Sequence, residues 1–182
     1  MIIIKTLFSY RIILSFCLLF FFQSNAQEQE LFKISYEKEV PTLKGLNGSF
    51  SGIHNGVLIL AGGTNFPNKA LWDGGEKEWY SDIYVLEKKE NQTIWYDKLS
   101  VSLPRPLANG VSINTNKGLL CFGGDNKEGV FKSVYLLKWN EINKEVEIET
   151  LPPMPIPLSN MGGAVVDDVV YLIGGQQEKD NI

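Results

Sequence analysis

A long polar and aromatic loop, residues 64–81, holds side chains suited to binding a small molecule. The loop follows an apolar run ending in Gly62 and Gly63 and spans eighteen residues. Loops beyond about 12–15 residues in a compact domain are commonly functional. Aromatic rings beside polar groups can stack on a sugar face and hydrogen-bond its hydroxyls. The candidates are Asn65, Lys69, Trp72 and Asp73, with Phe66, Trp79 and Tyr80 beside them. The alternative is that the aromatic residues fold onto the neighbouring strands as packing.

Arg105 is a candidate for binding an anion. It lies in the segment LPRPLANG, between Pro104 and Pro106, immediately before an expected strand. Proline fixes its own φ angle, so the backbone around Arg105 is stiff. A guanidinium can bind a carboxylate through two parallel hydrogen bonds. The alternative is an ordinary surface arginine.

Asp125 directly follows Gly124, where an apolar strand ends. A carboxylate there can act as a base or accept a hydrogen bond from a hydroxyl. It can equally cap the turn that follows, as aspartate often does. The sequence leaves both roles open.

Several kinds of chemistry are excluded by what the sequence holds. The single histidine, His54, lies in SGIHNGV beside an expected turn and is predicted to be structural or exposed. One histidine and scattered acids form no metal-ligand cluster, so we expect no metal. There is no GxSxG and no phosphate-binding loop. The 17 basic and 21 acidic residues give a net charge of −4, which is no footprint for nucleic acid.

These candidates lie on a sequence repeat. Glycine pairs end the apolar runs VLILAGG, LLCFGG and VVYLIGG, and the second glycines are 61 and 51 residues apart. A repeat near 50 residues is typical of kelch propeller blades. A proline-containing segment, a short strand and a tight turn precede each pair. The expected turns are Asn55 with Gly56, Asn116 to Gly118, and Asp167 with Asp168.

Each repeat predicts four antiparallel strands, so the fold is predicted to be all-β, a kelch-type β-propeller. The apolar runs do not alternate, and we expect them to be buried on both faces. Glycine suits the strand end near a crowded hub because it has no Cβ and turns freely.

The predicted blades cover about 42–100, 101–150 and an incomplete 151–182, with a lone outer strand at 31–40. This is about two and a half blades, whereas closed propellers have about four to eight. An open ring leaves bare sheet edges. We therefore expect a truncated chain.

Residues 1–26 are predicted to be a signal peptide. Lys5 and Arg11 flank an apolar stretch, residues 12–22, and a small-residue cleavage site ends at Ala26. The apolar stretch is shorter than the roughly 20 residues that span a bilayer, so we expect no membrane association after cleavage. The remainder, 27–182, holds 15 basic and 21 acidic residues.

Cleavage would also remove Cys17, which leaves Cys121 as a single cysteine that cannot form an intrachain disulfide. Cys121 lies in an apolar strand and is predicted to be a buried small hydrophobe. Export without disulfides favours a bacterial periplasm or outer surface.

The block GSFSGIHNGVLILAGGTNFPNKALWDGGEKEWYSDIYVLE resembles the N-acetylneuraminate epimerases, the sialic acid mutarotases. It is most similar to their cyclically permuted branch. GVSINTNKGLLCFGGDNKEGVFKSVYLL continues the resemblance, and LPPMPIPLSNMGGAVVDDVVYLIGG is similar to the beginning of the ordinary enzymes. The likeness covers about residues 36–176.

This resemblance implies a six-bladed periplasmic propeller that interconverts the anomers of free sialic acid by acid–base chemistry, without a cofactor. Arg105 is then the candidate for the substrate carboxylate. The family's proposed catalytic carboxylate lies in a blade that this chain does not reach. Asp125 has a comparable place in a different blade, so the catalytic residues stay unassigned and the activity of the truncated chain stays open. The alternative is a non-catalytic kelch module that binds glycans or a protein partner.

Overall fold

The computed structural model describes residues 34, 45–90, 92–97 and 99–178. The chain divides into two compact units, residues 1–36 and 37–182, and everything below concerns the second. The predicted signal peptide lies outside the described residues. So does the predicted outer strand at 31–40, apart from Ile34.

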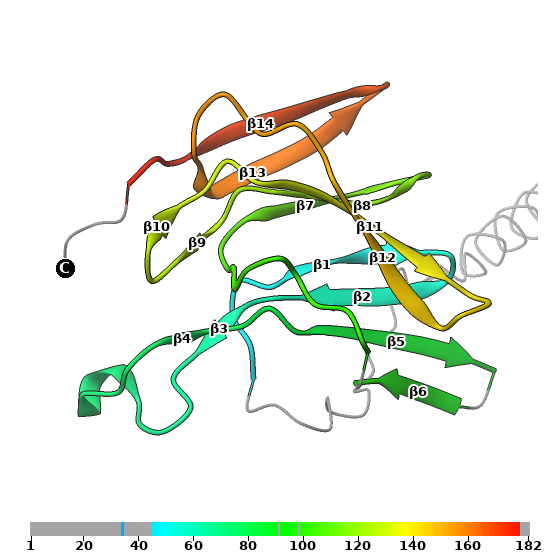
Figure 1. Cartoon of the computed structure of the whole chain (residues 1–182), viewed down its shortest axis with the longest axis horizontal. Coiled ribbons are helices and arrows are strands. Elements are labelled where there is room, and N and C mark those ends of the chain that lie inside the picture. Colours follow the sequence, from blue (N-terminus) through cyan, green and yellow to red (C-terminus); the bar gives the residue numbers. More distant parts are fainter. Residues whose placement is uncertain (1–33, 35–44, 91, 98, 179–182) are drawn as a thin grey trace, which may run out of the picture. The chain divides into compact units, whose positions relative to one another are not determined.

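Two four-stranded antiparallel sheets and a two-stranded hairpin follow one another along the chain (Figure 1). The first sheet has the order β1 (Phe50–His54), β2 (Val57–Ala61), β5 (Ile83–Lys89), β6 (Gln92–Tyr96). The second has β7 (Val111–Thr115), β8 (Gly118–Phe122), β11 (Val134–Asn140), β12 (Glu145–Thr150). The third pairs β13 (Ser159–Val166) with β14 (Val169–Gln176). This all-β array of propeller blades confirms the predicted fold class.

The tight turns form where the sequence places turn residues. Asn55 and Gly56 have φ angles of 48° and 75°, and His54 pairs with Val57 across them. Positive φ at both turn residues matches the twist of the flanking strands. Asp167 has a φ of 54° in the equivalent turn of the third sheet.

A small two-stranded ribbon follows each of the first two glycine pairs. In the first ribbon β3 (Thr64–Asn65) pairs with β4 (Glu78–Trp79), and the intervening insert contains the short helix η2 (Leu71–Asp73). In the second ribbon β9 (Asp125–Asn126) pairs with β10 (Gly129–Val130). Both ribbons lie at the same side of the sheets, opposite the tight turns (Figure 1). The long loop predicted at 64–81 is therefore an extended arm with its own ladder.

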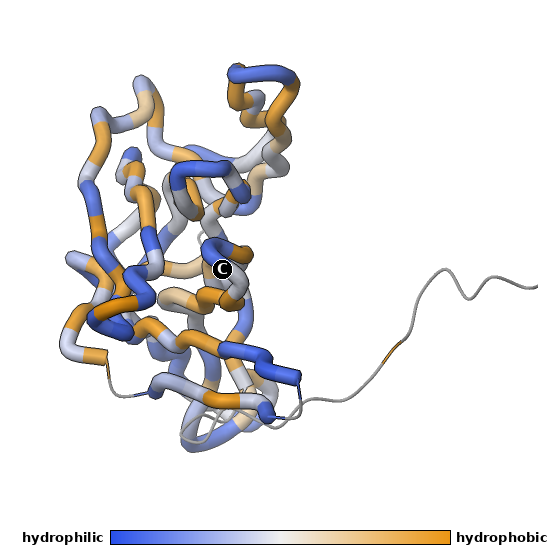
Figure 2. The backbone as a smooth tube through the Cα atoms, turned by 90° about the vertical axis from the view of Figure 1, so that its right-hand side faces the viewer, coloured by the Kyte–Doolittle hydropathy of each residue, from blue (hydrophilic) through white to orange (hydrophobic). Residues whose placement is uncertain are grey.

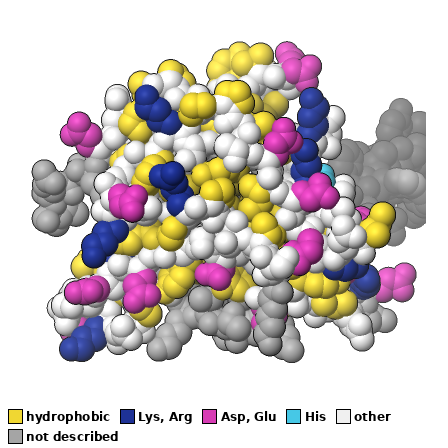
Figure 3. Space-filling view, viewed as in Figure 1, with side chains coloured by type: hydrophobic (Ala, Val, Ile, Leu, Met, Phe, Trp, Pro, Cys, Tyr) yellow, Lys and Arg dark blue, Asp and Glu magenta, His cyan; other side chains and the backbone are white. Residues whose placement is uncertain are grey.

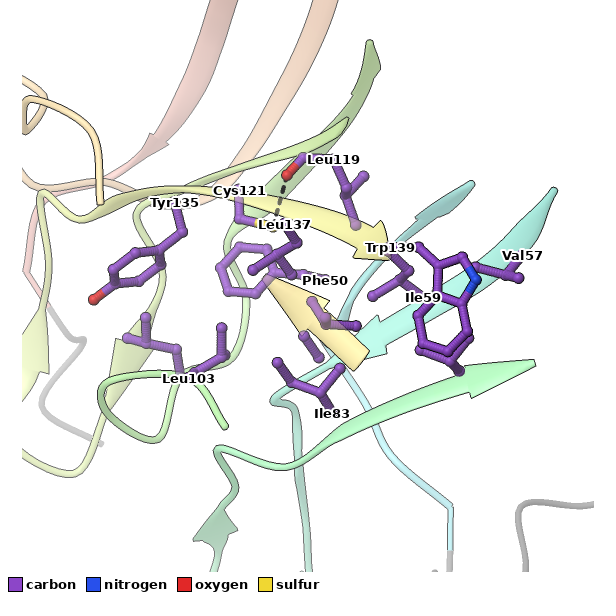
Figure 4. Packing of buried hydrophobic residues seen from close by; sticks show 14 residues of the cluster. Phe50, Val57, Ile59, Ile83, Leu103, Leu119, Cys121, Tyr135, Leu137 and Trp139 are labelled. Atoms are coloured by element: carbon purple, nitrogen blue, oxygen red, sulfur yellow. Dashed lines mark hydrogen bonds between the residues drawn. The ribbon is translucent and has the colours of Figure 1, made fainter. Parts of the chain in front are cut away.

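The main core lies between the first and second sheets (Figure 4). Both sheets contribute fully buried side chains, among them Phe50, Ile59, Val85, Leu119, Leu137 and Trp139. A smaller cluster around Val134, Met154 and Met161 joins the second and third sheets. The second sheet is thus covered on both faces.

The predicted burial of β2 on both faces needs correction. Val57, Ile59 and Ala61 are buried, whereas Leu58 and Leu60 are only half-buried. Figure 2 shows hydrophobic and hydrophilic residues alternating along much of the backbone. The reason is that side chains alternate across a strand, and among the described residues only the second sheet packs on β2.

The glycine pairs connect each sheet to the next. The Gly63 amide donates to the Leu107 carbonyl at 2.7 Å, and the Gly124 amide donates to the Leu158 carbonyl at 2.9 Å. The first glycine of each pair forms a hydrogen bond within its own sheet. The Gly62 amide donates at 2.9 Å to the carbonyl just before β5, and the Gly123 amide donates at 2.8 Å to the carbonyl just before β11. All four have φ between 61° and 106°, where L-residues are strained. A Cβ on Gly62 or Gly123 would also collide with the carbonyl of Leu107 or Leu158.

Candidate functional site

The two ribbons begin with the same hydrogen bonds. Thr64 and Asn47 exchange backbone bonds of 2.9 Å, and Asp125 exchanges bonds of 2.7 Å and 2.9 Å with Ala108. One residue later, the Asn65 amide donates to the Gly45 carbonyl at 3.1 Å. Asn126 donates to the Pro106 carbonyl at 3.0 Å in the same way. Thr64 and Asp125 therefore occupy equivalent positions on equivalent frames.

Asp125 is a buried carboxylate that fastens the first ribbon to the second ribbon. Its side chain is 3% exposed. Trp79 Nε1 donates to Oδ1 at 3.1 Å, and Asn109 Nδ2 donates to Oδ2 at 3.0 Å. Both carboxylate oxygens thus accept from side chains. The turn-capping role belongs to the next residue, because Asn126 Oδ1 accepts from the Glu128 amide at 2.7 Å.

The sequence left two roles open for the aromatic residues of the first ribbon, contact with a ligand and packing on the strands. The structure assigns different residues to each role. Trp79 and Tyr80 are half-buried, and the Tyr80 hydroxyl donates to Asn65 Oδ1 at 2.8 Å. Burial, and then the charge of Glu78, raise the pKa of Tyr80. Trp72 is 86% exposed on η2. Trp79 and Tyr80 are packing residues, whereas Trp72 is free to contact a ligand.

The predicted polar ligands of the first ribbon fall into two groups. Asn65 lies at the base of the ribbon, where its amide holds Gly45 and Tyr80. Lys69 and Asp73 are exposed in the insert near Trp72. Figure 1 shows η2 at the far end of the ribbon, well away from β9 and β10. The structure does not gather these four residues around one point.

A pocket of about 360 Å³ opens at the base of the first ribbon. Its lining consists of Gly45, Leu46, Asn47, Thr64, Asn65, Phe66 and Lys77. Lys77 is half-buried, and its Nζ lies 5.0 Å from the centroid of the Trp79 ring. Sequence analysis missed Lys77. No local sequence pattern marks Lys77, because its contact with the Trp79 ring exists only in the folded chain.

Arg105 is exposed, and its guanidinium carbon lies 4.5 Å from the centroid of the Phe131 ring. Phe131 is tied to the second ribbon, because its amide donates to the Gly124 carbonyl at 2.9 Å. Among the residues that the structure describes, no carboxylate forms an ion pair with Arg105. Arg105 is therefore a cation held on an aromatic face and open to solvent.

His54 and Cys121 are structural. His54 Nδ1 accepts from the Trp139 amide at 2.9 Å, and Asn55 donates to the Trp139 carbonyl at 3.1 Å. This turn of the first sheet is thereby fixed to β11. Cys121 is fully buried, and burial raises the pKa of its thiol.

The described residues hold no group of three or more His, Cys, Asp or Glu side chains placed to bind a metal. Within that same part of the chain, no helix has the length and apolar character needed to cross a bilayer. Positive and negative side chains are interspersed on the face seen in Figure 3. A cleft of about 910 Å³ also lies between the second and third sheets at the turn end, with Lys117, Lys138 and Asp168 in its lining.

The family model for N-acetylneuraminate epimerase matches residues 19–148, which is more than half of the chain. This chain belongs to the N-acetylneuraminate epimerase family. The match includes both ribbons, Lys77, Arg105 and Asp125.

Relatives in the family agree with this assignment. The chain is 37% identical over 113 residues to the N-acetylneuraminate epimerase of Vibrio cholerae, covering 57% of this chain and 28% of the relative. It is 36% identical over 107 residues to the enzyme of Brucella suis, covering 53% and 26%. The solved structure of YjhT superposes with a TM-score of 0.51 and 26% identity, covering 62% of this chain and 33% of that one. The chain thus spans about a quarter to a third of the length of these relatives.

Proposed function

We propose that this protein interconverts the α and β anomers of N-acetylneuraminate. The observation that carries the proposal is the family match over residues 19–148. The ribbon side of the sheets supports it, because it places a pocket, an exposed aromatic residue and two cations on loops carried by a rigid frame.

The reaction is acid–base chemistry on the sugar. A base takes the proton of the anomeric hydroxyl while an acid protonates the ring oxygen, and the ring carbon–oxygen bond breaks. The open-chain ketone rotates about the bond next to its carbonyl carbon and closes on the other face. Positioned acids and bases contribute about 10²–10⁴ each to such transfers. No redox step or group transfer occurs, so the proposal includes no cofactor.

The predicted residues take binding roles in this proposal. Arg105 offers a guanidinium on the ribbon side of the sheets, and its exposure, with no ion pair to any described residue, supports that role. Trp72, with Lys69 and Asp73 beside it, offers a stacking and hydrogen-bonding surface in the insert, apart from the pocket whose wall Asn65 holds. Asp125 accepts from two donors, so we propose it as a positioning residue and leave the acid and base unassigned.

The sugar is the proposed partner, with neither nucleic acid nor membrane involved. The proposed location is the periplasm or the cell exterior, after cleavage near Ala26. N-terminal sequencing of the protein secreted by a bacterial host tests this location. A mature chain that begins at Gln27 is expected.

A second function is a non-catalytic module that binds glycans or a protein. It is favoured by one observation: Asp125, the candidate base, has both oxygens engaged. Binding without turnover is its signature.

One NMR experiment distinguishes the two functions. The equilibration of freshly dissolved N-acetylneuraminate between its two anomers is followed with and without the full chain. The enzyme proposal predicts faster equilibration in proportion to protein concentration. An unchanged rate together with ligand-line broadening supports the binding module, and an unchanged rate without broadening contradicts the enzyme proposal and sialic acid binding alike.

A further inference from the structure

The pocket at the base of the first ribbon holds a cation with a fixed position. The ammonium of Lys77 lies over the Trp79 ring, 5.0 Å from its centroid. Trp79 is itself anchored, since its Nε1 donates to the buried Asp125 carboxylate at 3.1 Å. A cation over an aromatic ring is attracted to its π face. Lys77 is thus positioned by a chain of contacts that ends at Asp125 in the second ribbon.

Lys77 also lacks an anionic partner among the described residues. Lys77 stands between two acids, Glu76 and Glu78, and forms an ion pair with neither. The Glu78 carboxylate instead accepts from the Tyr80 hydroxyl at 3.3 Å. The charge of a half-buried ammonium is screened less than that of an exposed one. Such a group in a pocket attracts an anion.

The rest of the pocket is rigid and sized for one monosaccharide. Its volume of about 360 Å³ lies at the small end of ligand pockets, which measure about 300–1,000 Å³. The Asn65 amide is held by Gly45 and Tyr80, and the backbone groups of Thr64 and Asn47 bond each other. Phe66 adds an apolar surface. Lys77 is the strongest hydrogen-bond donor that this lining presents.

We propose that this pocket binds the carboxylate end of a sugar acid and that Lys77 Nζ donates to the carboxylate. The identity of the sugar as N-acetylneuraminate rests on the proposed function. The assignment places the carboxylate at Lys77 in the first ribbon and not at Arg105, which lies outside the pocket lining. The pocket is a specificity determinant, because a ligand without the negative charge leaves Lys77 unpaired.

The experiment compares N-acetylneuraminate with its methyl ester, which has the same shape and no carboxylate charge. Binding of both ligands to the full chain is measured by titration calorimetry for wild type, Lys77→Met, Lys77→Arg and Arg105→Met, which removes the other candidate cation. Circular dichroism and thermal melts confirm that each variant is folded. Lys77→Met should weaken binding of the acid about ten- to a hundredfold, the value of a charge-assisted hydrogen bond. It should leave binding of the ester unchanged.

Lys77→Arg should restore most of the preference for the acid, and Arg105→Met should retain it. The proposal is overturned if wild type binds acid and ester equally, if it binds neither, or if Arg105→Met alone removes the preference. Anomer equilibration is followed in the same samples. Acid preference that depends on Lys77 without acceleration contradicts the proposed function and leaves the pocket intact. If Lys77→Met changes neither the acceleration nor the binding of the acid, the proposed function stands and the pocket assignment is contradicted.

Discussion

The first and second ribbons begin with the same hydrogen bonds but differ in length and in the residues that they carry. Each begins after a glycine pair, pairs with the incoming segment of its own sheet, and uses an asparagine, Asn65 or Asn126, to hold a backbone carbonyl. The second ribbon turns back within a few residues, between Asn126 and Gly129. The first extends through an insert that carries Trp72 and Lys77 before it returns at Glu78.

The difference shows how this scaffold separates stability from function. The glycine pair before each ribbon, here called the glycine joint, and the asparagine hydrogen bond fix the direction of the ribbon. An insert can therefore lengthen without disturbing the sheets. The position after the glycine pair then connects the ribbons: Asp125 of the second accepts from Trp79 of the first. Strain in the joint should affect the whole fold, whereas changes in the insert should affect binding alone.

The largest expected effect is at the glycine joints. Gly123→Ala puts a Cβ against the Leu158 carbonyl at a φ of 61°, and we expect a loss of about 3 kcal/mol or more in unfolding free energy. Gly62→Ala should match it, because its Cβ meets the equivalent Leu107 carbonyl. Gly174→Ala is the control: its φ is 74° with nothing within 4 Å, so only the strain of about 1–2 kcal/mol applies. Urea denaturation measures the unfolding free energy of all three variants. An equal loss for Gly174→Ala and the two joint variants would show that the carbonyl contacts at the joints add nothing to the cost.

The next effect is at the position after the glycine pair. Asp125→Ala leaves Trp79 Nε1 and Asn109 Nδ2 without their acceptor, which should cost about 2–4 kcal/mol, since each buried unpaired donor costs about 1–3. Thr64→Val removes one hydroxyl bond to the Glu78 carbonyl and should cost about 1 kcal/mol. Trp79→Phe keeps an aromatic ring but loses the Nε1 donor and part of the ring area, and its cost should fall between them. A smaller loss for Asp125→Ala than for Thr64→Val would show that Asp125 does not fasten the ribbons.

A smaller effect lies at the end of the sheets away from the ribbons. The Tyr96 hydroxyl donates to Glu87 at 2.7 Å, and this bond, with the charges of Lys144 and Lys89, lowers the pKa of Glu87. A carboxyl group whose pKa is lowered by folding stabilises the folded state at pH values above its unfolded pKa of 4.5. This stabilisation is lost as the pH falls through the pKa of the folded state. Wild type should therefore exceed Tyr96→Phe in stability at neutral pH, and the gap should narrow below pH 4.5. A gap constant from neutral to acid would contradict this linkage.

The smallest effect on stability is expected in the insert. Trp72→Ala changes a side chain that is 86% exposed, so unfolding free energy should stay within about 0.5 kcal/mol of wild type. Binding of N-acetylneuraminate should weaken roughly two- to tenfold, the value of one aromatic contact. Trp95→Ala in β6 is a comparison outside the ribbons, and its effect on sugar binding should be absent. Equal binding by Trp72→Ala and wild type would remove Trp72 from the site.

Much of the frame follows from local sequence signals. The strands, the turn at Asn55 and Gly56, and the glycine pairs were predictable because turn chemistry and apolar runs act over a few residues. Cys121 was predictable for the same reason. The two-sided burial of β2 was wrong, since an apolar run does not reveal which faces neighbouring sheets cover.

The site depends on contacts between distant residues, and those were not predictable. Asp125 meets Trp79 across 46 residues, so its turn-capping alternative looked equally good from sequence. Asn65 resembled a sugar ligand until its bonds to Gly45 and Tyr80 were seen. In the sequence Lys77 is one charge in an acidic stretch, and only its contact with the Trp79 ring distinguishes it.

The most direct test of this account is a crystal structure of the full chain with N-acetylneuraminate. The account predicts sugar density on the ribbon side, with its carboxylate within hydrogen-bonding distance of Lys77 Nζ and its ring beside Phe66. Density in the cleft between the second and third sheets, near Lys117 and Lys138, or at the tight turns would contradict it.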